Sequence, residues 1–345
     1  MAYYRCMEHA EISAALLADL RSLLGRPALA YLDPPVPLTG GYDTAIFAFQ
    51  LKGAPPDFSG GLVLRLFGEN AARRARFEGV AQTAVADLGY PAPRALHVSE
   101  SGGQLGRAYL VMPRIDGKQL IAVGILRFGA LLAGAQVALH ALDPVPVRLA
   151  LEAADCGPIA AGIDDWLKTL DAEVAQPGLE GLRPAYEWLA NNRPRRPARA
   201  VICHLDFHPL NVLAENGAVT GVVDWAGMSF GDPAADVGVT RVILTLAPFE
   251  APRLLKPVAQ QVRRLLAWRY TSAYRKLRPL SADAVRYYEA LRCFEAMSHL
   301  SRMRLAERGG SPVTSTGYAW SDPATVRRLT RHFLRITGVE LGVLA

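Results

Sequence analysis

The sequence lacks paired cysteines, internal repeats and a recognisable secretory leader. Its cysteines (Cys6, Cys156, Cys203 and Cys293) are scattered and form no C-x-x-C pair, which argues against a disulfide framework and a zinc knuckle. The first 25 residues carry apolar side chains at helical spacing with charges between them, unlike a signal peptide. We therefore expect reduced thiols and a cytoplasmic protein. With 51% hydrophobic and 20% charged residues, the chain of 345 residues can bury a large core.

The sequence also has little that could cross a membrane. One long apolar run covers residues 120–139, and its polar residues are Arg127 and Gln136. A run of this length could span a bilayer, but an arginine near its centre costs about 2.5 to 3.5 kcal/mol. We therefore expect a helix buried in a globular lobe and no membrane partner.

Acidic and basic residues are unevenly divided along the chain. Residues 1–240 carry 20 basic and 25 acidic side chains, a net charge of −5, whereas residues 241–345 carry 18 and 7, a net charge of +11. Two interpretations remain open for this basic third: solvated helix faces, or a pocket or surface suited to anions. A nucleic-acid-binding role lacks a supporting motif and interleaved aromatic residues, so we expect no nucleic-acid partner.

Short apolar segments separated by turns predict a small antiparallel sheet in residues 30–113. Val36 and Leu38 lead into a glycine pair, and a segment rich in β-formers follows, so we expect strand, turn and strand. A helix is inserted after the third strand and ends at Gly89. The last two strands pair around the glycines at 102–103. The expected strands are 46–51, 61–67, 94–98 and 107–112, and the expected helices are 11–24 and 69–89.

From residue 114 onward the pattern is mainly helical. The exception is residues 201–224, which are typical of a loop followed by two short strands joined across Asn216-Gly217, a dipeptide that favours tight hairpins. Pro233 directly after Asp232 predicts a helix with an aspartate N-cap. The expected helices are 118–141, 161–174, 182–191, 233–247, 251–276, 281–306 and 323–337.

Polar side chains gather in the loop that precedes this hairpin. His204, Asp206, His208 and Asn211 fall within eight positions of an otherwise apolar run, and Asp224 follows Asn211 by thirteen residues. An aspartate on such a loop can accept a proton from an attacking hydroxyl. An asparagine and a second aspartate can ligate Mg²⁺ that bridges nucleotide phosphates, because Mg²⁺ prefers oxygen ligands and keeps several waters. The spacing predicts phosphoryl transfer, with Asp206 as the base and Asn211 and Asp224 as metal ligands.

The predicted sheet supplies the other parts of a phosphate site. Gly40 and Gly41 lie in a turn that can cover phosphates. Arg65 interrupts an otherwise apolar strand, where a basic side chain can contact phosphate. Glu78 lies on the following helix, where it can orient that base. These residues can therefore hold nucleotide phosphates and Mg²⁺.

These segments resemble a known family. CHLDFHPLNVL and GVVDWAGMSFGDPAADVG are similar to the aminoglycoside phosphotransferase and choline kinase-like family, relatives of the protein kinases. The usual form in that family is H-G-D-x-H-P-x-N, followed by D-W or D-F and then G-D-P-x-x-D. YLVMPRIDG and LHALDP also fall in the family's order, so the resemblance covers residues 30–240. It implies an α+β, two-lobed, protein-kinase-like fold with a nucleotide-binding lobe in residues 1–113 and a larger, mainly helical catalytic and substrate-binding lobe in residues 114–345.

The resemblance also implies roles for single residues. Val111 and Met112 resemble the linker whose backbone hydrogen-bonds adenine. His204 belongs to the catalytic motif with Asp206 and resembles the residue that braces the catalytic loop. Arg65 takes the place of the phosphate-holding lysine.

Three positions depart from the family's pattern. Arg65 is not equivalent to a lysine, because its guanidinium is a planar fork and not a point charge. Leu205 stands where glycine is usual, and Ala226 stands where an acid is common. None of these removes the base or a metal ligand. The resemblance therefore implies an active enzyme that uses ATP (or GTP) and Mg²⁺ to phosphorylate a hydroxyl of a small molecule.

Three alternatives remain open. A nucleotide-binding regulatory module that transfers no phosphate is one alternative, and Arg65 and Leu205 are its only support. Cys203, His204 and His208 could form a metal site, although a second cluster at zinc spacing is missing. The enzyme could also be a true aminoglycoside or other antibiotic kinase. A site for a polycation requires clustered acids, so the basic third predicts a neutral or anionic hydroxylated acceptor.

Overall fold

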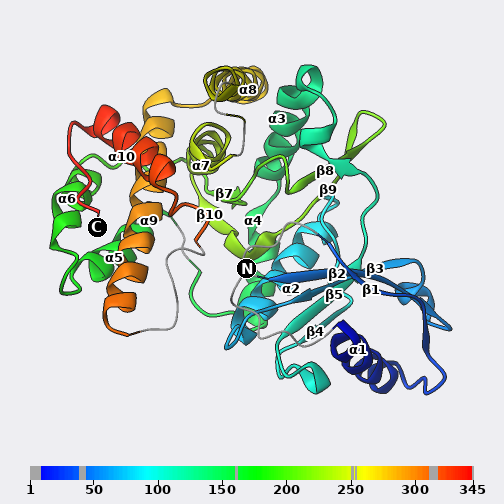
Figure 1. The fold of residues 1–345 in the computed structure, drawn as a ribbon. Helices are drawn as coiled ribbons and strands as arrows, with labels where there is room; N and C mark the ends of the chain where they lie inside the picture. Colours follow the sequence, from blue (N-terminus) through cyan, green and yellow to red (C-terminus); the bar gives the residue numbers. More distant parts are fainter. Residues whose placement is uncertain are drawn as a thin grey trace. The chain divides into compact units, whose positions relative to one another are not determined.

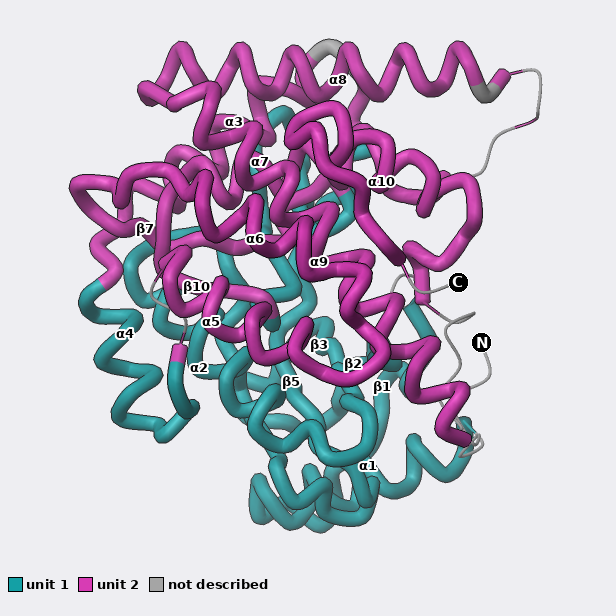
Figure 2. Tube along the Cα trace, turned by 90° about the vertical axis from the view of Figure 1, so that its left-hand side faces the viewer, with its two compact units in different colours: residues 1–122, 145–158, 210–226 teal, residues 123–144, 159–209, 227–345 magenta. Residues whose placement is uncertain are grey.

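The computed structural model describes residues 9–38, 44–159, 162–249, 252, 255–310 and 318–343 (Figure 1). The chain divides into two compact units (Figure 2). Unit 1 contains residues 1–122, 145–158 and 210–226, and unit 2 contains residues 123–144, 159–209 and 227–345. Both units are discontinuous in sequence. The lobe boundary expected at residue 113 therefore stays a prediction.

Unit 1 is built on a five-stranded antiparallel sheet with the strand order β1-β2-β3-β5-β4. β1 carries Pro34 and Pro35, which an edge strand tolerates because one of its sides needs no ladder partner. The helix expected after the third strand is present. The elements are α1 (His9–Leu24), β1 (Ala30–Pro37), β2 (Ala45–Lys52), β3 (Gly61–Leu66), α2 (Ala72–Asp87), β4 (His97–Ser99) and β5 (Tyr109–Pro113).

The two faces of this sheet pack against different helices. Along β3, Leu62, Leu64 and Leu66 join a core that includes Leu16 and Leu20 of α1. Because strand side chains alternate between faces, the intervening positions of β3 point to the other face, where α2 packs. Arg65 is one of these positions, so the alternation alone directs it toward α2.

Helix α2 lies very close to the sheet at Gly79. A Cβ atom at this position would lie 2.5 Å from Val98 Cγ2 on β4, which is closer than real Cβ atoms approach. The Thr83 hydroxyl also accepts a hydrogen bond of 2.9 Å from the Ala95 backbone N–H. Glu78, the residue before Gly79, is thereby held on the sheet side of the helix and is fully buried.

A three-stranded sheet with the order β6-β8-β9 contains the predicted hairpin. Its strands are β6 (Lys118–Gln119), β8 (Val212–Glu215) and β9 (Ala218–Val222). Asn216 and Gly217 have φ values of +51° and +82°, as a tight hairpin turn requires. The expected helix start at 118 is wrong, because Lys118 pairs with β8 and Gly124 has a φ of +99°. Helix α3 begins at Ile125.

Unit 2 is mainly helical and contains the short strands β7 and β10, which pair with each other. Helix α7 lies against α8, α9 and β7, and most of its residues are buried. The predicted N-cap is confirmed, since Asp232 Oδ1 accepts the Ala234 N–H at 2.8 Å. The elements are α3 (Ile125–Ala141), α5 (Ile163–Val174), α6 (Arg183–Asn191), β7 (Val201–Cys203), β10 (Ser229–Gly231), α7 (Pro233–Leu246), α8 (Lys256–Leu277), α9 (Ala282–Arg308) and α10 (Pro323–Thr337). Helix α4 (Pro144–Ala153) falls almost entirely in unit 1.

Residues 125–139 of the apolar run belong to helix α3, which is largely buried, as expected. Phe128, Leu132 and Leu139 of α3 are buried, and α3 packs closely on α8 at Gly129, where a Cβ would lie 3.0 Å from the Tyr270 backbone nitrogen. In the part of the chain that the structure describes, no single helix is long and apolar enough to cross a membrane. One bent pair, Arg127–Ala141 with Pro144–Ala153, meets that test by length and composition only.

Candidate active site

Arg65 forms the centre of a buried ion-pair group in unit 1. Its Nη1 lies 3.0 Å from Glu78 Oε1, and its Nη2 donates to Asp224 Oδ1 at 2.8 Å. The side chains of Arg65 and Glu78 are 5% and 0% exposed, whereas that of Asp224 is 33% exposed. Burial raises the pKa of Glu78 to about 7, although the charge of Arg65 acts in the opposite direction. Three residues that the sequence assigned to one site therefore meet.

The β8–β9 hairpin places Asn211 beside the strand that leads into Asp224. Val212 pairs with Val222, and the Val223 N–H donates to the Asn211 carbonyl at 2.9 Å. Asp224 then adopts left-handed backbone with a φ of +67°, which aspartate tolerates better than most residues. An amide and a carboxylate at the open end of one hairpin are the kind of oxygen donors that Mg²⁺ takes.

The remaining sequence-assigned residues of unit 1 are placed less directly. Val111 and Met112 lie inside β5, and both are buried. The Val111 carbonyl accepts the Leu96 N–H at 2.9 Å, and the Met112 sulfur accepts from Gln82 Nε2 at 3.5 Å. Gly40 and Gly41 lie outside the described residues. The adenine and phosphate roles of these four residues stay predictions.

In unit 2, helix α7 holds the backbone of the loop that carries Asp206. The Asp236 carboxylate accepts two successive backbone N–H groups, from His204 at 3.0 Å and from Leu205 at 2.8 Å. One turn later, the Thr240 hydroxyl donates to the Phe207 carbonyl at 2.9 Å. Because residues four apart share a helix face, α7 fixes the chain on both sides of Asp206.

His204 supports Asp206 from beneath the loop. It is fully buried, its Nδ1 accepts the Asp206 N–H at 3.3 Å, and its ring meets Phe207 edge-on. The Asp206 side chain is 38% exposed, with Oδ2 3.4 Å from His208 Nε2. Burial tends to raise the pKa of Asp206, but the His208 hydrogen bond and the charges of His208, His204 and Arg292 outweigh it and lower the pKa to about 2. The carboxylate is therefore ionised at neutral pH, as a proton acceptor requires.

Sequence reasoning missed the network behind this loop. His140 of α3 lies between two partners, with Nε2 3.0 Å from Asp236 Oδ2 and Nδ1 2.6 Å from the Tyr274 hydroxyl. Burial tends to raise the pKa of Asp236, but the His140 hydrogen bond and charge lower it. The spacing G-D-P-x-x-D was the available signal, because it puts Asp236 one turn after the N-cap Asp232.

Cys203, His204 and His208, which were considered as a metal site, do not together form a group of potential metal ligands among the described residues. Among the described residues, one group of acidic, histidine and cysteine side chains lies close enough to share an ion, and it consists of His140, Cys203 and Asp236. All three are buried, and their contacts are those of a hydrogen-bonded core: Asp236 binds His140 and loop N–H groups, and the Cys203 thiol donates to the Asp232 carbonyl at 3.5 Å.

Several arginines of the basic third cap helix ends. Arg263 donates to the carbonyls of Ile243, Leu244 and Ala247 at the end of α7 at 2.7 to 3.0 Å. Arg278 donates to the His140 carbonyl at the end of α3 at 2.8 Å. Cations stabilise helix C-termini, where carbonyls lack partners. The net charge of this third therefore overstates the positive charge that a ligand could meet.

Known proteins were compared with this chain by sequence and by structure. The sequence matches the profile of the phosphotransferase enzyme family over residues 36–280. No curated protein matches it.

Solved structures share the fold over nearly its whole length. A candidate aminoglycoside phosphotransferase from Ralstonia eutropha JMP134 is 18% identical, with 93% of this chain and 98% of that one covered and a TM-score of 0.59. Aminoglycoside phosphotransferase APH(4)-Ia is 17% identical over 92% and 98% of the two chains, with a TM-score of 0.56. Macrolide 2′-phosphotransferase MphH from Brachybacterium faecium is 19% identical over 90% and 98%, with a TM-score of 0.53. These likenesses confirm the predicted α+β, kinase-like fold.

The family profile covers most of the chain and includes the whole segment from the Arg65 strand to the α7 network. The chain belongs to the phosphotransferase enzyme family.

Proposed function

We propose that this enzyme transfers the γ-phosphoryl group of ATP or GTP to a hydroxyl of a small molecule, with Mg²⁺ as cofactor. The observation that carries the proposal is the buried group in which Arg65 meets Glu78 and Asp224. A basic strand residue, an acidic helix residue and a metal-binding aspartate are the parts that a kinase-like site needs around nucleotide phosphates. Structures of APH(4)-Ia variants with AMP-PNP or ADP and hygromycin B have the same fold and support a nucleotide and a small-molecule acceptor.

In this proposal Asp206 is the catalytic base. Its ionised carboxylate accepts the hydrogen bond of the acceptor hydroxyl, orients its oxygen and takes its proton. The bond from that oxygen to the γ-phosphorus forms as the bond from the γ-phosphorus to the departing ADP (or GDP) oxygen breaks. His204 is a positioning residue, because it holds the Asp206 backbone. Asp236 is also a positioning residue, because its carboxylate binds the backbone N–H groups of His204 and Leu205. Positioning of this kind, together with charge stabilisation, supplies most of the acceleration in phosphoryl transfer.

The residues of unit 1 would bind the nucleotide and the metal. Arg65, oriented by Glu78, would contact phosphate oxygens. Asn211 and Asp224 fit Mg²⁺ because both offer oxygen donors. When bound, the ion would neutralise charge on the phosphates.

We also propose that Gly40, Gly41, Val111 and Met112 contact the nucleotide, and that residues 1–113 and 114–345 form the two lobes. The free, buried thiols of Cys156, Cys203 and Cys293 support a cytoplasmic location.

A thermal-shift titration with ATP and Mg²⁺ tests this site. Saturation at 100 times the Kd stabilises a protein by about 2.7 kcal/mol, which raises Tm by several degrees. We expect a Mg²⁺-dependent rise in the wild type that is lost in Asp224→Asn, since asparagine tolerates the left-handed backbone but removes the charged ligand. Glu215→Ala is the matched control, because Glu215 is an exposed acid on the same hairpin. No rise in wild type with either ATP or GTP would contradict the proposal.

We further propose that the acceptor is not a polycationic aminoglycoside. Two basic side chains act on Asp206: His208, whose Nε2 lies 3.4 Å from Asp206 Oδ2, and Arg292, whose charge helps to lower the pKa of Asp206. A cationic substituent next to the reacting hydroxyl would meet these groups unfavourably. Because several arginines of the basic third bind carbonyls at helix ends, the total charge of that third is a poor guide to the charge at the site. The prediction therefore rests on the basic side chains near Asp206.

A coupled assay of ATP consumption compares kanamycin with neutral sugars and hydroxylated carboxylic acids at equal concentrations. Turnover should be confined to neutral or anionic acceptors. Rapid phosphorylation of kanamycin at a micromolar KM would instead favour a true aminoglycoside kinase. ATP binding without turnover on any acceptor would favour the regulatory module, which Arg65 and Leu205 support.

A further inference from the structure

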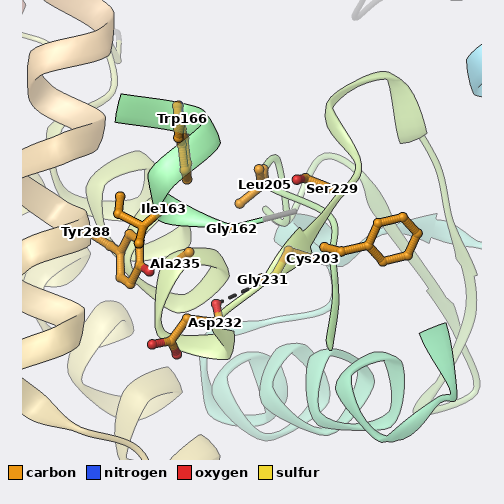
Figure 3. A pocket seen from close by; sticks show the side chains of 11 residues that line it. Gly162, Ile163, Trp166, Cys203, Leu205, Ser229, Gly231, Asp232, Ala235 and Tyr288 are labelled. Atoms are coloured by element: carbon orange, nitrogen blue, oxygen red, sulfur yellow. Dashed lines mark hydrogen bonds between the residues drawn. The ribbon is translucent and has the colours of Figure 1, made fainter. Parts of the chain in front are cut away.

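A small pocket of unit 2 opens beside the residue that precedes Asp206 (Figure 3). The start of α5, strands β7 and β10, the start of α7 and Tyr288 of α9 contribute to it. Figure 3 shows Trp166 and Leu205 reaching into the same space from α5 and from the catalytic loop. Ile163, Phe230 and Tyr288 also line it, so its large side chains are apolar or aromatic.

The aromatic part of this pocket is held in place. The Trp166 and Tyr288 rings lie 6.4 Å apart at 31°. The Trp166 indole N–H donates to Glu295 Oε1, and Glu295 in turn lies 3.7 Å from Arg292, the arginine whose charge acts on Asp206. The pocket and the proposed base are therefore linked through α9 as well as through the loop.

Leu205 has a backbone conformation that leucine rarely adopts. Its φ is +59°, in the left-handed region that glycine enters freely and that a side chain with a Cβ makes unfavourable. Glycine is the usual residue at this place in the motif that the sequence resembles. The conformation is maintained because the Leu205 N–H donates to Asp236 Oδ1 at 2.8 Å. A strained residue that the surroundings hold in place points to a function for its side chain.

Core packing does not account for Leu205. Its side chain is only partly buried, and it lines a pocket rather than a filled interior. Trp166 is also partly exposed. Two large apolar side chains, Leu205 and Trp166, thus have surface that the protein leaves uncovered. Leu205 directly precedes the proposed base, so the Cα atoms of the two residues are about 3.8 Å apart.

We propose that Leu205 and Trp166 form the walls of an acceptor subsite that takes an apolar group. The substrate class is therefore a hydroxylated molecule with an apolar substituent close to its reactive hydroxyl. Apolar surface that the substituent covers leaves water, which favours binding, and a uniformly polar sugar gains nothing from these walls. This inference rests on the proposed function, because the pocket becomes an acceptor site only if Asp206 is the base.

Methyl, propyl and hexyl β-D-glucosides are suitable probes, because they share the hydroxyls and differ in the apolar group. Calorimetric titration into the wild type with AMP-PNP and Mg²⁺ should show affinity rising by roughly fourfold for each methylene that enters the pocket. Because the pocket is small, the rise should level off once the first carbons of the chain fill it. Leu205→Gly and Leu205→Asn should lose most of this rise. Both substitutes tolerate positive φ, so their Tm should equal or exceed that of the wild type. Leu210→Ala removes an exposed leucine of the same motif and should behave as the wild type.

The same titrations separate the two ideas. An equal rise with chain length in the wild type and in Leu205→Gly would overturn the subsite, and so would a flat series in a wild type that binds AMP-PNP. In either case the proposed phosphotransfer would stand. A wild type that binds neither AMP-PNP nor the corresponding GTP analogue would remove the proposed function and this inference together.

Discussion

Replacing Asp206 with alanine is expected to lower turnover by about 10²- to 10⁴-fold, the range for loss of a general base, and to leave nucleotide affinity unchanged. The carboxylate lies in unit 2, whereas the proposed nucleotide and metal residues lie in unit 1, so the two properties should separate. Turnover with an active acceptor and a thermal-shift titration with ATP and Mg²⁺ measure them independently. Near-normal turnover in the variant would refute the assignment of the base.

Two controls sharpen this experiment. Asp143→Ala removes an exposed aspartate of unit 2 that pairs with Arg199, and its turnover should match that of the wild type. Because the pKa of Asp206 is about 2, the wild-type base stays ionised as the pH falls from neutral to about 4. The acceptor for this test should have no group that titrates between about pH 4 and 7. A loss of turnover in that interval would then contradict a base whose pKa is lowered.

Replacing Asp236 with alanine is expected to reduce the free energy of unfolding by several kcal/mol, at about 1 to 3 kcal/mol for each buried donor that loses its acceptor. The change leaves the backbone N–H groups of His204 and Leu205, and His140 Nε2, without the acceptor that binds them. A buried donor without a partner costs the desolvation free energy of that group. A loss of this size is a large part of the stability of an ordinary domain. Urea unfolding followed by fluorescence measures it.

Asp232→Ala is the matched control for this prediction. Asp232 lies one turn earlier on the same helix and caps its first turn through the Ala234 N–H. Loss of such a cap costs about 1 kcal/mol. Equal unfolding free energies for the two variants would mean that Asp236 acts as an ordinary helix residue and that the loop is fixed by other contacts.

Local patterns predicted most of the elements. The strands of the five-stranded sheet and most of the helices follow from apolar periodicity and from glycine and proline positions. The errors occurred where distant residues decide. Strand β7 is only three residues long and exists because it pairs with residues 229–231, and Lys118 and Gln119 are extended because they pair with β8. Helix α4 was missed because it begins Pro-Val-Pro, although prolines in a first turn remove no helical hydrogen bond.

The candidate site was predictable to a similar depth. The motif assigned Asp206, Asn211 and Asp224 the roles that are proposed for them, and strand alternation explains why Arg65 meets Glu78. The support behind the loop was not predictable, because His140 reaches Asp236 from a helix 96 residues earlier in the sequence. The left-handed backbone of Leu205 was also hidden, since no sequence rule assigns a positive φ to leucine. The net charge of residues 241–345 suggested more positive charge for a ligand than the structure offers, because several arginines there bind carbonyls at helix ends.

The close approach of α2 at Gly79 has a consequence for control of the enzyme. In protein kinases, the matching helix can move and take its glutamate away from the strand cation, which turns activity off. With no Cβ at Gly79 and with Val98 directly opposite, α2 is in contact with the sheet along its backbone, and its displacement would open a void beneath it. We therefore expect α2 to stay packed on the sheet and the Glu78–Arg65 pair to persist when no nucleotide is bound.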